Sequence, residues 1–407
     1  MVLPYNEYWH DTFPLKNPVP TPLLGRKLPF GRLARKEYAI RIPKKSRVSS
    51  LRDSLPMVSN LEREIMKEED DNDGVTIAEE PTRGIADAWQ EIHGQYDWAG
   101  MLDPFDPLLR SELIRYGEMA QACYDAFDFD PFSRYCGSCK FKPSNFFQCL
   151  GLSSHGYNLT RNLYATYNIN LPNFFKRSLW PEGWSPTANW MGYVAVSNDE
   201  TSKNIGRRDI TIAWRGTVTR DDWVADFTDF LRPVTLNKIP CPDPTVKVES
   251  GFLHLYTDKD KSCRFCKYSA REQILAEVKR LIQLYANEDL SITITGHSLG
   301  SALAIINAYD MAETGVDVME DGRVVPISVF SFSGPRVGNI RFKERLEGLG
   351  VKVLRVVNVH DKVPREGRKV YACQQKGHCT GEQGYRLFKG SLPGSTTLVA
   401  MSEQRAG

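Results

Sequence analysis

The sequence has no run of eighteen or more apolar residues, so it predicts no helix that crosses a membrane. It also has almost no excess of charge, because 52 Lys and Arg stand against 50 Asp and Glu and give a formal net charge of +2. That balance gives no reason to expect nucleic acid as the main partner. With 41% hydrophobic and 25% charged residues, the composition is typical of a globular protein.

Cysteine is also scarce, and its pattern argues against a secreted disulfide framework. The count of nine is odd, and the first residues lack the apolar segment of a secretory signal. Two C-x-x-C pairs occur, Cys136/Cys139 and Cys263/Cys266, but more than a hundred positions separate them. A zinc site built from two such pairs usually needs a spacing of about 15–20 residues. Free thiols or a redox-sensitive pair are therefore the favoured interpretation, and no metal or organic cofactor is expected.

Charge is distributed unevenly near the beginning of the chain. Residues 1–60 carry eleven Lys and Arg against four Asp and Glu, whereas residues 61–80 carry two against nine. The basic block resembles an organelle transit peptide, although a disordered basic tail would have the same composition. The acidic block is typical of a solvated linker. We expect residues 1–82 to form this extension, residues 83–365 the folded domain, and residues 366–407 an irregular tail.

The most informative stretch of the sequence surrounds Ser298. Residues 290–295 predict a short strand, residues 296–300 (GHSLG) a tight turn, and residues 302–312 a helix. This is the context in which G-x-S-x-G forms a nucleophile elbow. Side chains at Gly296 and Gly300 would collide with the neighbouring strand and helix, and the first helical turn would place the N–H of Leu299 beside a developing oxyanion. We therefore predict that Ser298 is a catalytic nucleophile and that His297 packs beneath the turn.

Other segments predict the scaffold that carries this turn. Strands are expected at residues 190–196, 208–214, 326–332 and 352–359, and helices at residues 106–127, 269–286 and 342–349, whereas the aromatic-rich stretch 157–190 suggests a loop. Strands that read as continuous apolar runs and alternate with helices indicate a mostly parallel sheet with helices on both faces. Residues 222–244 fit a mobile lid and a plain connecting loop equally well.

Two further candidate site residues come after predicted strands. Thr217 follows the strand that ends in AWRGT, a position that suits a second oxyanion donor. Asp361 follows the strand at residues 352–359, and acyl hydrolases of this layout have the triad order Ser, Asp, His. Asp361 therefore fits the acid that orients a histidine.

Several motifs together give the sequence a family resemblance. GHSLGSALA, AWRGT, VESGF, SFSGPRVGN and VVNVHDKVP, with the upstream stretches DWAGMLDPFDPLLRSELIRYGEMAQACYDAFDFDP and LYATYNINLPNFF, resemble the class 3 lipases and, among them, the chloroplast branch of plant phospholipases A1. The resemblance implies an α/β-hydrolase fold, a chloroplast location, and hydrolysis of sn-1 acyl esters in phospholipids, galactolipids and triacylglycerol met at the membrane surface. It also implies that Ser298 is the nucleophile and Asp361 the acid, with oxyanion donors at Thr217 and Leu299.

The resemblance stops at Pro364, before the motif in which the family has its catalytic histidine. His378 is the only histidine that follows Asp361, and it lies in a segment without a predicted scaffold. We therefore expect the domain to be incomplete at its C-terminal end. A serine acyl hydrolase remains the leading hypothesis, the alternative being a catalytically impaired form that binds lipids or partners. An acyltransferase is a third hypothesis, because an alcohol can replace water in the second step.

Overall fold

The computed structural model describes residues 83–166, 175–217, 231–235, 239–358, 363, 390–391 and 396–401, all of which fall within one compact unit. The extension expected at residues 1–82 lies outside the described residues, as does most of the stretch 222–244. No helix in the described part of the chain is both long enough and apolar enough to cross a membrane.

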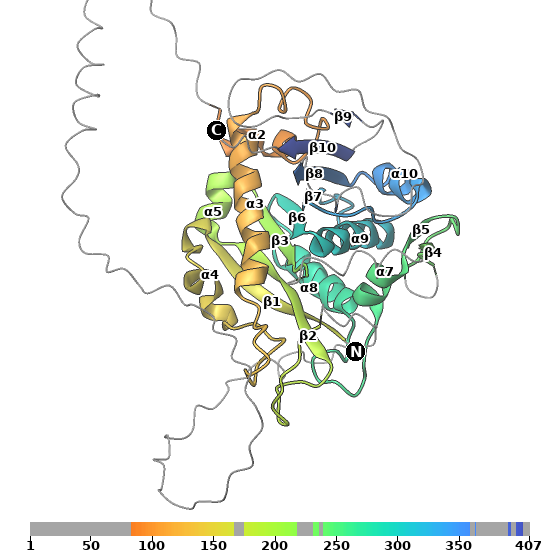
Figure 1. Ribbon diagram of the computed structural model, residues 1–407. Helices are drawn as coiled ribbons and strands as arrows, with labels where there is room; N and C mark the ends of the chain where they lie inside the picture. Colours follow the sequence, from red (N-terminus) through yellow and green to blue (C-terminus); the bar gives the residue numbers. More distant parts are fainter. Residues whose placement is uncertain are drawn as a thin grey trace, which may run out of the picture. The chain divides into compact units, whose positions relative to one another are not determined.

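An eight-stranded sheet forms the centre of the molecule (Figure 1). The strands follow the order β1-β2-β3-β6-β7-β8-β10-β9, and neighbours are parallel from β3 to β10. The pairs β1/β2, β2/β3 and β10/β9 are antiparallel. The strands are β1 (Tyr157–Thr166), β2 (Ala188–Ser197), β3 (Arg208–Trp214), β6 (Leu290–His297), β7 (Ile327–Phe332), β8 (Lys352–Asn358), β9 (Gly390–Ser391) and β10 (Thr396–Met401), and a separate hairpin pairs β4 (Leu231–Pro233) with β5 (Lys247–Glu249).

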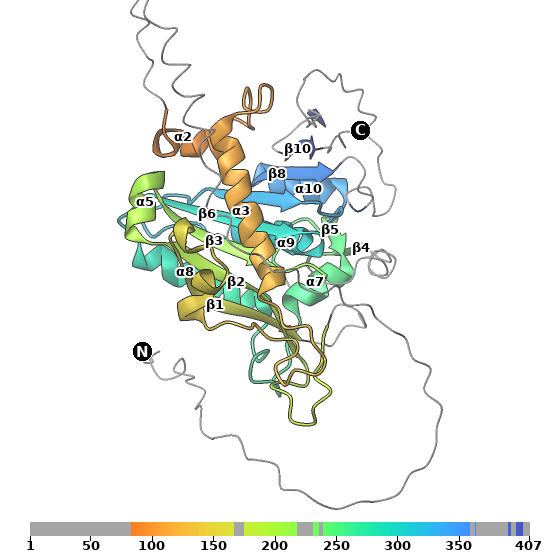
Figure 2. The same cartoon turned by 60° about the vertical axis from the view of Figure 1, so that its left-hand side comes forward.

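Helices cover both faces of this sheet, as Figure 2 shows for α3 on one side and α8 and α9 on the other. Asp106 begins α3 by accepting the N–H groups of Leu108 and Leu109, a cap worth about 1 kcal/mol. The S-x-x-E pattern at residues 269–272 predicts a capping box, and Ser269 and Glu272 form it at the start of α8. The helices are α2 (Ile85–Ile92), α3 (Pro107–Asp125), α4 (Phe146–Cys149), α5 (Asp199–Ile205), α7 (Ser250–Thr257), α8 (Ala270–Leu284), α9 (Leu299–Thr314) and α10 (Ile340–Gly348), with short 3₁₀ helices at Pro143–Asn145 and Ser153–His155.

Two hydrophobic cores result, one on each face of the sheet. Successive strand residues point to opposite faces, so Val329 of β7 packs with α8 and α9 while Phe330 packs with α2 and α3. Burial on both faces explains why the central strands read as continuous apolar runs. The arrangement is that of an α/β-hydrolase fold, as the sequence predicts.

The structure differs from the sequence-based expectations at the two edges of the sheet. The stretch expected as a loop from residue 157 begins with β1, whose mixed polar and aromatic residues are only partly buried because the strand lies at the edge. The tail expected to be irregular from residue 366 contributes β9 and β10, and β10 pairs in parallel with β8. That pairing depends on tertiary contact, so no local hydrophobic periodicity in the sequence predicts it.

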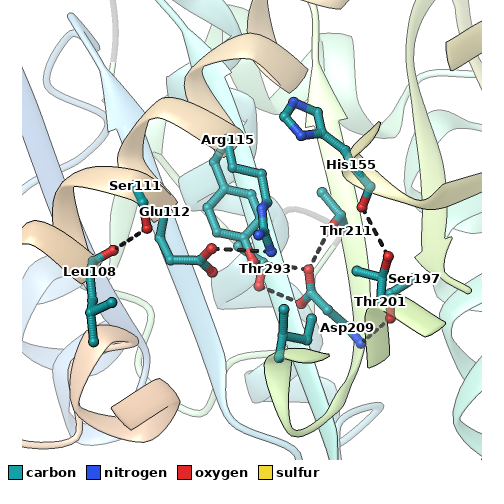
Figure 3. Close-up of polar contacts among 12 residues, drawn as sticks. Leu108, Ser111, Glu112, Arg115, His155, Ser197, Thr201, Asp209, Thr211 and Thr293 are labelled. Atoms are coloured by element: carbon teal, nitrogen blue, oxygen red, sulfur yellow. Dashed lines mark hydrogen bonds and ion pairs between the residues drawn. The ribbon is translucent and has the colours of Figure 1, made fainter. Parts of the chain in front are cut away.

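A buried carboxylate joins the amino ends of the central strands. Asp209, at the start of β3, is fully buried and accepts hydrogen bonds from five hydroxyl groups. These come from α3, β1, β3 and β6, over distances of 2.6–3.0 Å, and belong to Tyr116, Tyr157, Thr211, Ser291 and Thr293. Figure 3 shows Asp209 with two of these donors, Thr211 and Thr293. One charge thus fixes a helix and three strands to each other.

Arg207 supplies the balancing positive charge. Its side chain has no exposed surface, and it donates to Ser291 at 2.9 Å, to Tyr116 at 3.2 Å and to Glu112 at 3.3 Å. Burial alone would raise the pKa of Asp209, but Arg207 and the hydroxyl hydrogen bonds hold that pKa below its ordinary value. The carboxylate is therefore ionised in the folded protein at neutral pH.

Replacing the Asp209 carboxylate is expected to lower the stability of the folded protein. The Asp209→Asn substitution removes the charge opposite Arg207 and should lower the free energy of unfolding by about 3 kcal/mol in a urea titration at neutral pH. Because the folded pKa of Asp209 is lowered, its contribution is present above about pH 4 and disappears as the pH falls further. The difference in the free energy of unfolding between wild type and Asp209→Asn should therefore become smaller below about pH 4. Asp321→Asn, at a half-exposed pair with Arg323, is the control and should leave the stability close to that of the wild type. An equal loss in both variants would contradict this account.

Candidate active site

Ser298 lies between the end of β6 and the start of α9, with backbone angles φ 57° and ψ −124°. A positive φ is unusual for a residue with a side chain and costs about 1–3 kcal/mol. Such strain persists where the surrounding structure holds it, and it is concentrated at functional sites. The structure thus confirms the strand, tight turn and helix that the sequence predicts around this serine.

The two glycines of the turn are required because backbone segments meet there. A Cβ atom on Gly296 would lie 2.4 Å from the carbonyl carbon of Gly300, and one on Gly300 would lie 2.3 Å from the carbonyl oxygen of Trp214. Both distances are far below van der Waals contact. Any side chain at either position would therefore push β3, β6 and α9 apart.

Hydrogen bonds from the adjacent strand hold the turn in place. The N–H of Ser298 donates to the carbonyl of Phe332, at the end of β7, over 2.9 Å. The hydroxyl of Ser301 donates to the carbonyls of Gly296 and Phe332. Leu299 is the first residue of α9, so its N–H belongs to the positive end of the helix dipole, directly after the nucleophile candidate.

Thr217 reaches the same edge of the sheet from the neighbouring strand. Trp214, the last residue of β3, stands beside Gly296 in the parallel register of β3 and β6. The two strands therefore end together, and the chain continues through Arg215 and Gly216 to Thr217, which is partly exposed. The structure thus brings Ser298, Leu299 and Thr217 to one edge.

Arg215 anchors the loop that leads to Thr217. Its guanidinium is fully buried, donates to the carbonyls of Trp190 at 2.9 Å and Gly216 at 3.0 Å, and lies over the ring of Phe127. Burial lowers the pKa of Arg215 to about 9, so the side chain remains charged at neutral pH. The sequence shows this arginine within AWRGT, but the carbonyl groups that it binds belong to β2 and to its own loop, which no local pattern indicates.

Tyr124, near the end of α3, connects the turn at Ser298 with the loop that leads to Thr217. Its hydroxyl lies 2.8 Å from Nδ1 of His297 and 3.3 Å from the carbonyl oxygen of the same residue. Both groups are satisfied when the Nδ1–H donates to the phenol oxygen and the phenol O–H donates to the carbonyl. A Cβ atom on Gly216 would lie 2.1 Å from that hydroxyl, so Tyr124 also packs closely against the loop that leads to Thr217. His297 is exposed, so the prediction that it packs beneath the turn is wrong.

Asp361 and His378 lie outside the described residues. The strand before Asp361, β8, ends at Asn358 and runs parallel to β7 and β6, so the chain leaves it at the edge that carries Ser298. Residues 222–230 and 236–238 also lie outside the described residues, so the interpretation of the stretch 222–244 as a lid or as a connecting loop stays open. Within the described ranges, no group of three or more His, Cys, Asp or Glu side chains is arranged to hold a metal ion.

The strain at Ser298 can be measured through stability. At φ 57° alanine keeps the unfavourable backbone conformation, whereas glycine adopts it freely. Ser298→Gly should therefore be more stable than Ser298→Ala by about 1 kcal/mol in chemical denaturation. At Ala308, in the middle of α9, the order should reverse, and Ala308→Gly should lose about 1 kcal/mol relative to wild type. If alanine were the more stable residue at both positions, Ser298 would carry no strain.

Comparison with known proteins places this site in a family. The family model described as Lipase (class 3) matches residues 211–368, a range that includes Thr217, Ser298 and Asp361. Phospholipase A1-Igamma2, chloroplastic, of Arabidopsis thaliana is 64% identical over 290 residues, 70% of this chain and 55% of that protein. Phospholipase A1-Igamma1, chloroplastic, of the same plant is 61% identical over 311 residues, 73% of this chain and 60% of that protein. The chain thus spans little more than half the length of these two relatives.

A third relative is matched over more of its own length. Phospholipase A1-II 6 of Oryza sativa subsp. japonica is 42% identical over 292 residues, which cover 69% of this chain and 71% of that protein. Identity at this level over most of a relative, together with the serine turn and the parallel sheet described above, shows that the chain belongs to the class 3 lipase family.

Proposed function

We propose that this chain is a serine acyl hydrolase that cleaves sn-1 acyl esters of membrane phospholipids and galactolipids. The observation that carries the proposal is the strained turn at Ser298. This turn presents a serine between the end of β6 and the start of α9, at the edge where Thr217 also lies. Two of the relatives support the substrate class, since their names describe phospholipases A1, and a 45% identical Arabidopsis thaliana relative is named Galactolipase DONGLE.

In the proposed reaction, the hydroxyl of Ser298 attacks the ester carbonyl and forms an acyl-enzyme, which water then hydrolyses. The N–H groups of Leu299 and Thr217 stabilise the oxyanion, and removal of one such donor typically costs a factor of about 10²–10³ in kcat. Asp361 orients the histidine that takes the serine proton. We do not assign that histidine to His297, because it adjoins Ser298 along the chain and its Nδ1 is bound to Tyr124.

Two loops with exposed apolar side chains support a docking surface for membranes. The loop 128–140 follows α3, and the loop 176–187 precedes β2, so both extend from the edge that carries Ser298. The indole N–H of Trp180 donates to the carbonyl of Phe132, and the N–H of Leu179 to that of Pro131, which joins the loops. Their large apolar side chains are 50–73% exposed: Phe129, Phe132, Tyr135, Leu179 and Trp180. Exposed aromatic residues of this kind suit the interface of a bilayer.

Location is part of the same proposal. Three relatives with 58–64% identity carry chloroplastic in their names. With the basic composition of residues 1–60, these names support a transit peptide within residues 1–82 and a chloroplast location, with residues 83–365 as the hydrolase domain.

The catalytic role of Ser298 can be tested with two readouts. Wild-type protein should release the sn-1 fatty acid from vesicles of phosphatidylcholine or galactolipid and should form a covalent adduct with a fluorophosphonate. Ser298→Ala should lose the adduct and at least about 10⁴-fold in kcat, because no nucleophile remains. Ser202→Ala, at a buried serine remote from this edge, should label as the wild type does. Equal hydrolysis by wild type and Ser298→Ala, or a folded wild type that neither labels nor hydrolyses, would refute the proposal.

The docking surface predicts a separation between soluble and vesicular substrates. Replacing Phe132 and Trp180 with serine removes exposed apolar area and should weaken vesicle binding by at least about tenfold. Hydrolysis of a short-chain soluble ester should remain within about twofold of wild type. Leu284→Ser is the matched control, because Leu284 is 60% exposed but lies at the end of α8, beside the start of β6. Equal vesicle binding by both variants would remove these loops from the proposal.

A further inference from the structure

The proposed reaction leaves the two C-x-x-C pairs without a role, and their surroundings differ. All four cysteines are free thiols. Cys263 and Cys266 lie in the turn between α7 and α8, packed against Ala188 and the rings of Tyr164, Trp184 and Phe265. Two backbone hydrogen bonds close this turn, from Asp260 N–H to the Cys266 carbonyl and from Cys263 N–H to the Asp260 carbonyl.

Hydrogen-bond donors converge on the sulfur of Cys263. The hydroxyl oxygen of Ser185 lies 3.6 Å from this sulfur and accepts the N–H of Ala188 at 3.0 Å and that of Thr187 at 3.4 Å. Its lone pairs are thus occupied, and its single hydrogen is directed to the sulfur. Burial would raise the pKa of Cys263, but hydrogen bonds from Thr187, Ser185 and the backbone of Cys266 and Phe265 bring that pKa below its ordinary value.

Cys266 is the more deeply buried residue of this pair. It has no exposed surface, and its side chain packs with that of Cys263 in one buried cluster. Burial, and then the charge of the Cys263 thiolate, raise the pKa of Cys266. Cys263 is the outer partner, with 6% of its surface exposed. Exposed cations flank it on the same turn, namely Lys261, Arg264 and Lys267, together with Lys259, which pairs with Glu272, and the carboxylates of Asp258 and Asp260.

The other pair provides an internal comparison with the same spacing. Burial and the carboxylates of Asp128 and Asp130 raise the pKa of Cys136 to about 11. Burial raises the pKa of Cys139 to about 11 as well. Both sulfur atoms are therefore protonated at neutral pH, and a protonated thiol is a poor nucleophile.

We propose that Cys263 and Cys266 form a redox-active dithiol that low-molecular-weight disulfides, such as glutathione disulfide, convert into an intrachain disulfide. The Cys263 thiolate attacks one sulfur of the reagent, forms a mixed disulfide and expels one thiolate. Cys266 then gives up its proton to solvent and attacks the Cys263 sulfur, which expels the second thiolate. The protein loses two hydrogens, and one disulfide reagent becomes two thiols.

Oxidation of the full-length protein followed by peptide mapping tests this assignment. After incubation with glutathione disulfide at neutral pH and acid quenching, mass spectrometry should find Cys263 linked to Cys266, while Cys136 and Cys139 remain reduced. Cys266→Ser should accumulate a glutathione adduct on Cys263, and Cys263→Ser should form no adduct on Cys266. Dithiothreitol should restore both thiols in the wild type.

Reactivity toward iodoacetamide provides an independent measurement that needs no cysteine substitution. In the reduced wild type, Cys263 should be alkylated at least about tenfold faster than Cys136 at neutral pH. Ser185→Ala should slow alkylation of Cys263 about fivefold and leave the rate at Cys136 unchanged. Oxidation of both pairs at similar rates, or alkylation of Cys263 no faster than that of Cys136, would overturn the proposal. Neither readout depends on ester hydrolysis.

Discussion

A close approach of backbone segments, where β3 and β6 end and α9 begins, governs the rest of the site. Gly296 and Gly300 allow this approach because a Cβ atom on either would overlap backbone atoms at 2.3–2.4 Å. The contact forces Ser298 into its positive φ, and it places the exit of β3 beside the serine. The position of Thr217 therefore follows from the same constraint that places Ser298 at this edge of the sheet.

The two ends of the parallel strands have different physical roles. At their amino ends, the buried carboxylate of Asp209 binds hydroxyl groups of one helix and three strands, and the buried guanidinium of Arg207 lies between it and the carboxylate of Glu112. At their carboxyl ends, buried Arg215 and the phenol of Tyr124 hold loops rather than strands. A rigid amino end allows the opposite loops to carry the chemistry without loss of the fold.

Much of the fold, and the centre of the site, could be predicted from the sequence because their signals are local. The strand Arg208–Trp214 and the capping box of α8 were predicted with their boundaries, and the GHSLG turn has the predicted geometry. Edge strands β1 and β10 were missed, since half-exposed or tertiary pairing leaves no clear period. Tyr124 and the partners of Asp209 were missed for a related reason: each contact joins residues far apart in sequence, as Tyr124 and His297 are by 173 positions.

The pairing of β10 with β8 has a consequence for how molecules of this protein meet each other. Six residues, Thr396–Met401, run along β8 and engage the backbone groups on its outer side. Without them, β8 would present a row of unpaired N–H and C=O groups to any extended chain nearby, which is the usual route to association through sheet edges. In the described residues, an extended chain that approaches this side of the sheet therefore meets β10, part of which β9 covers, rather than β8.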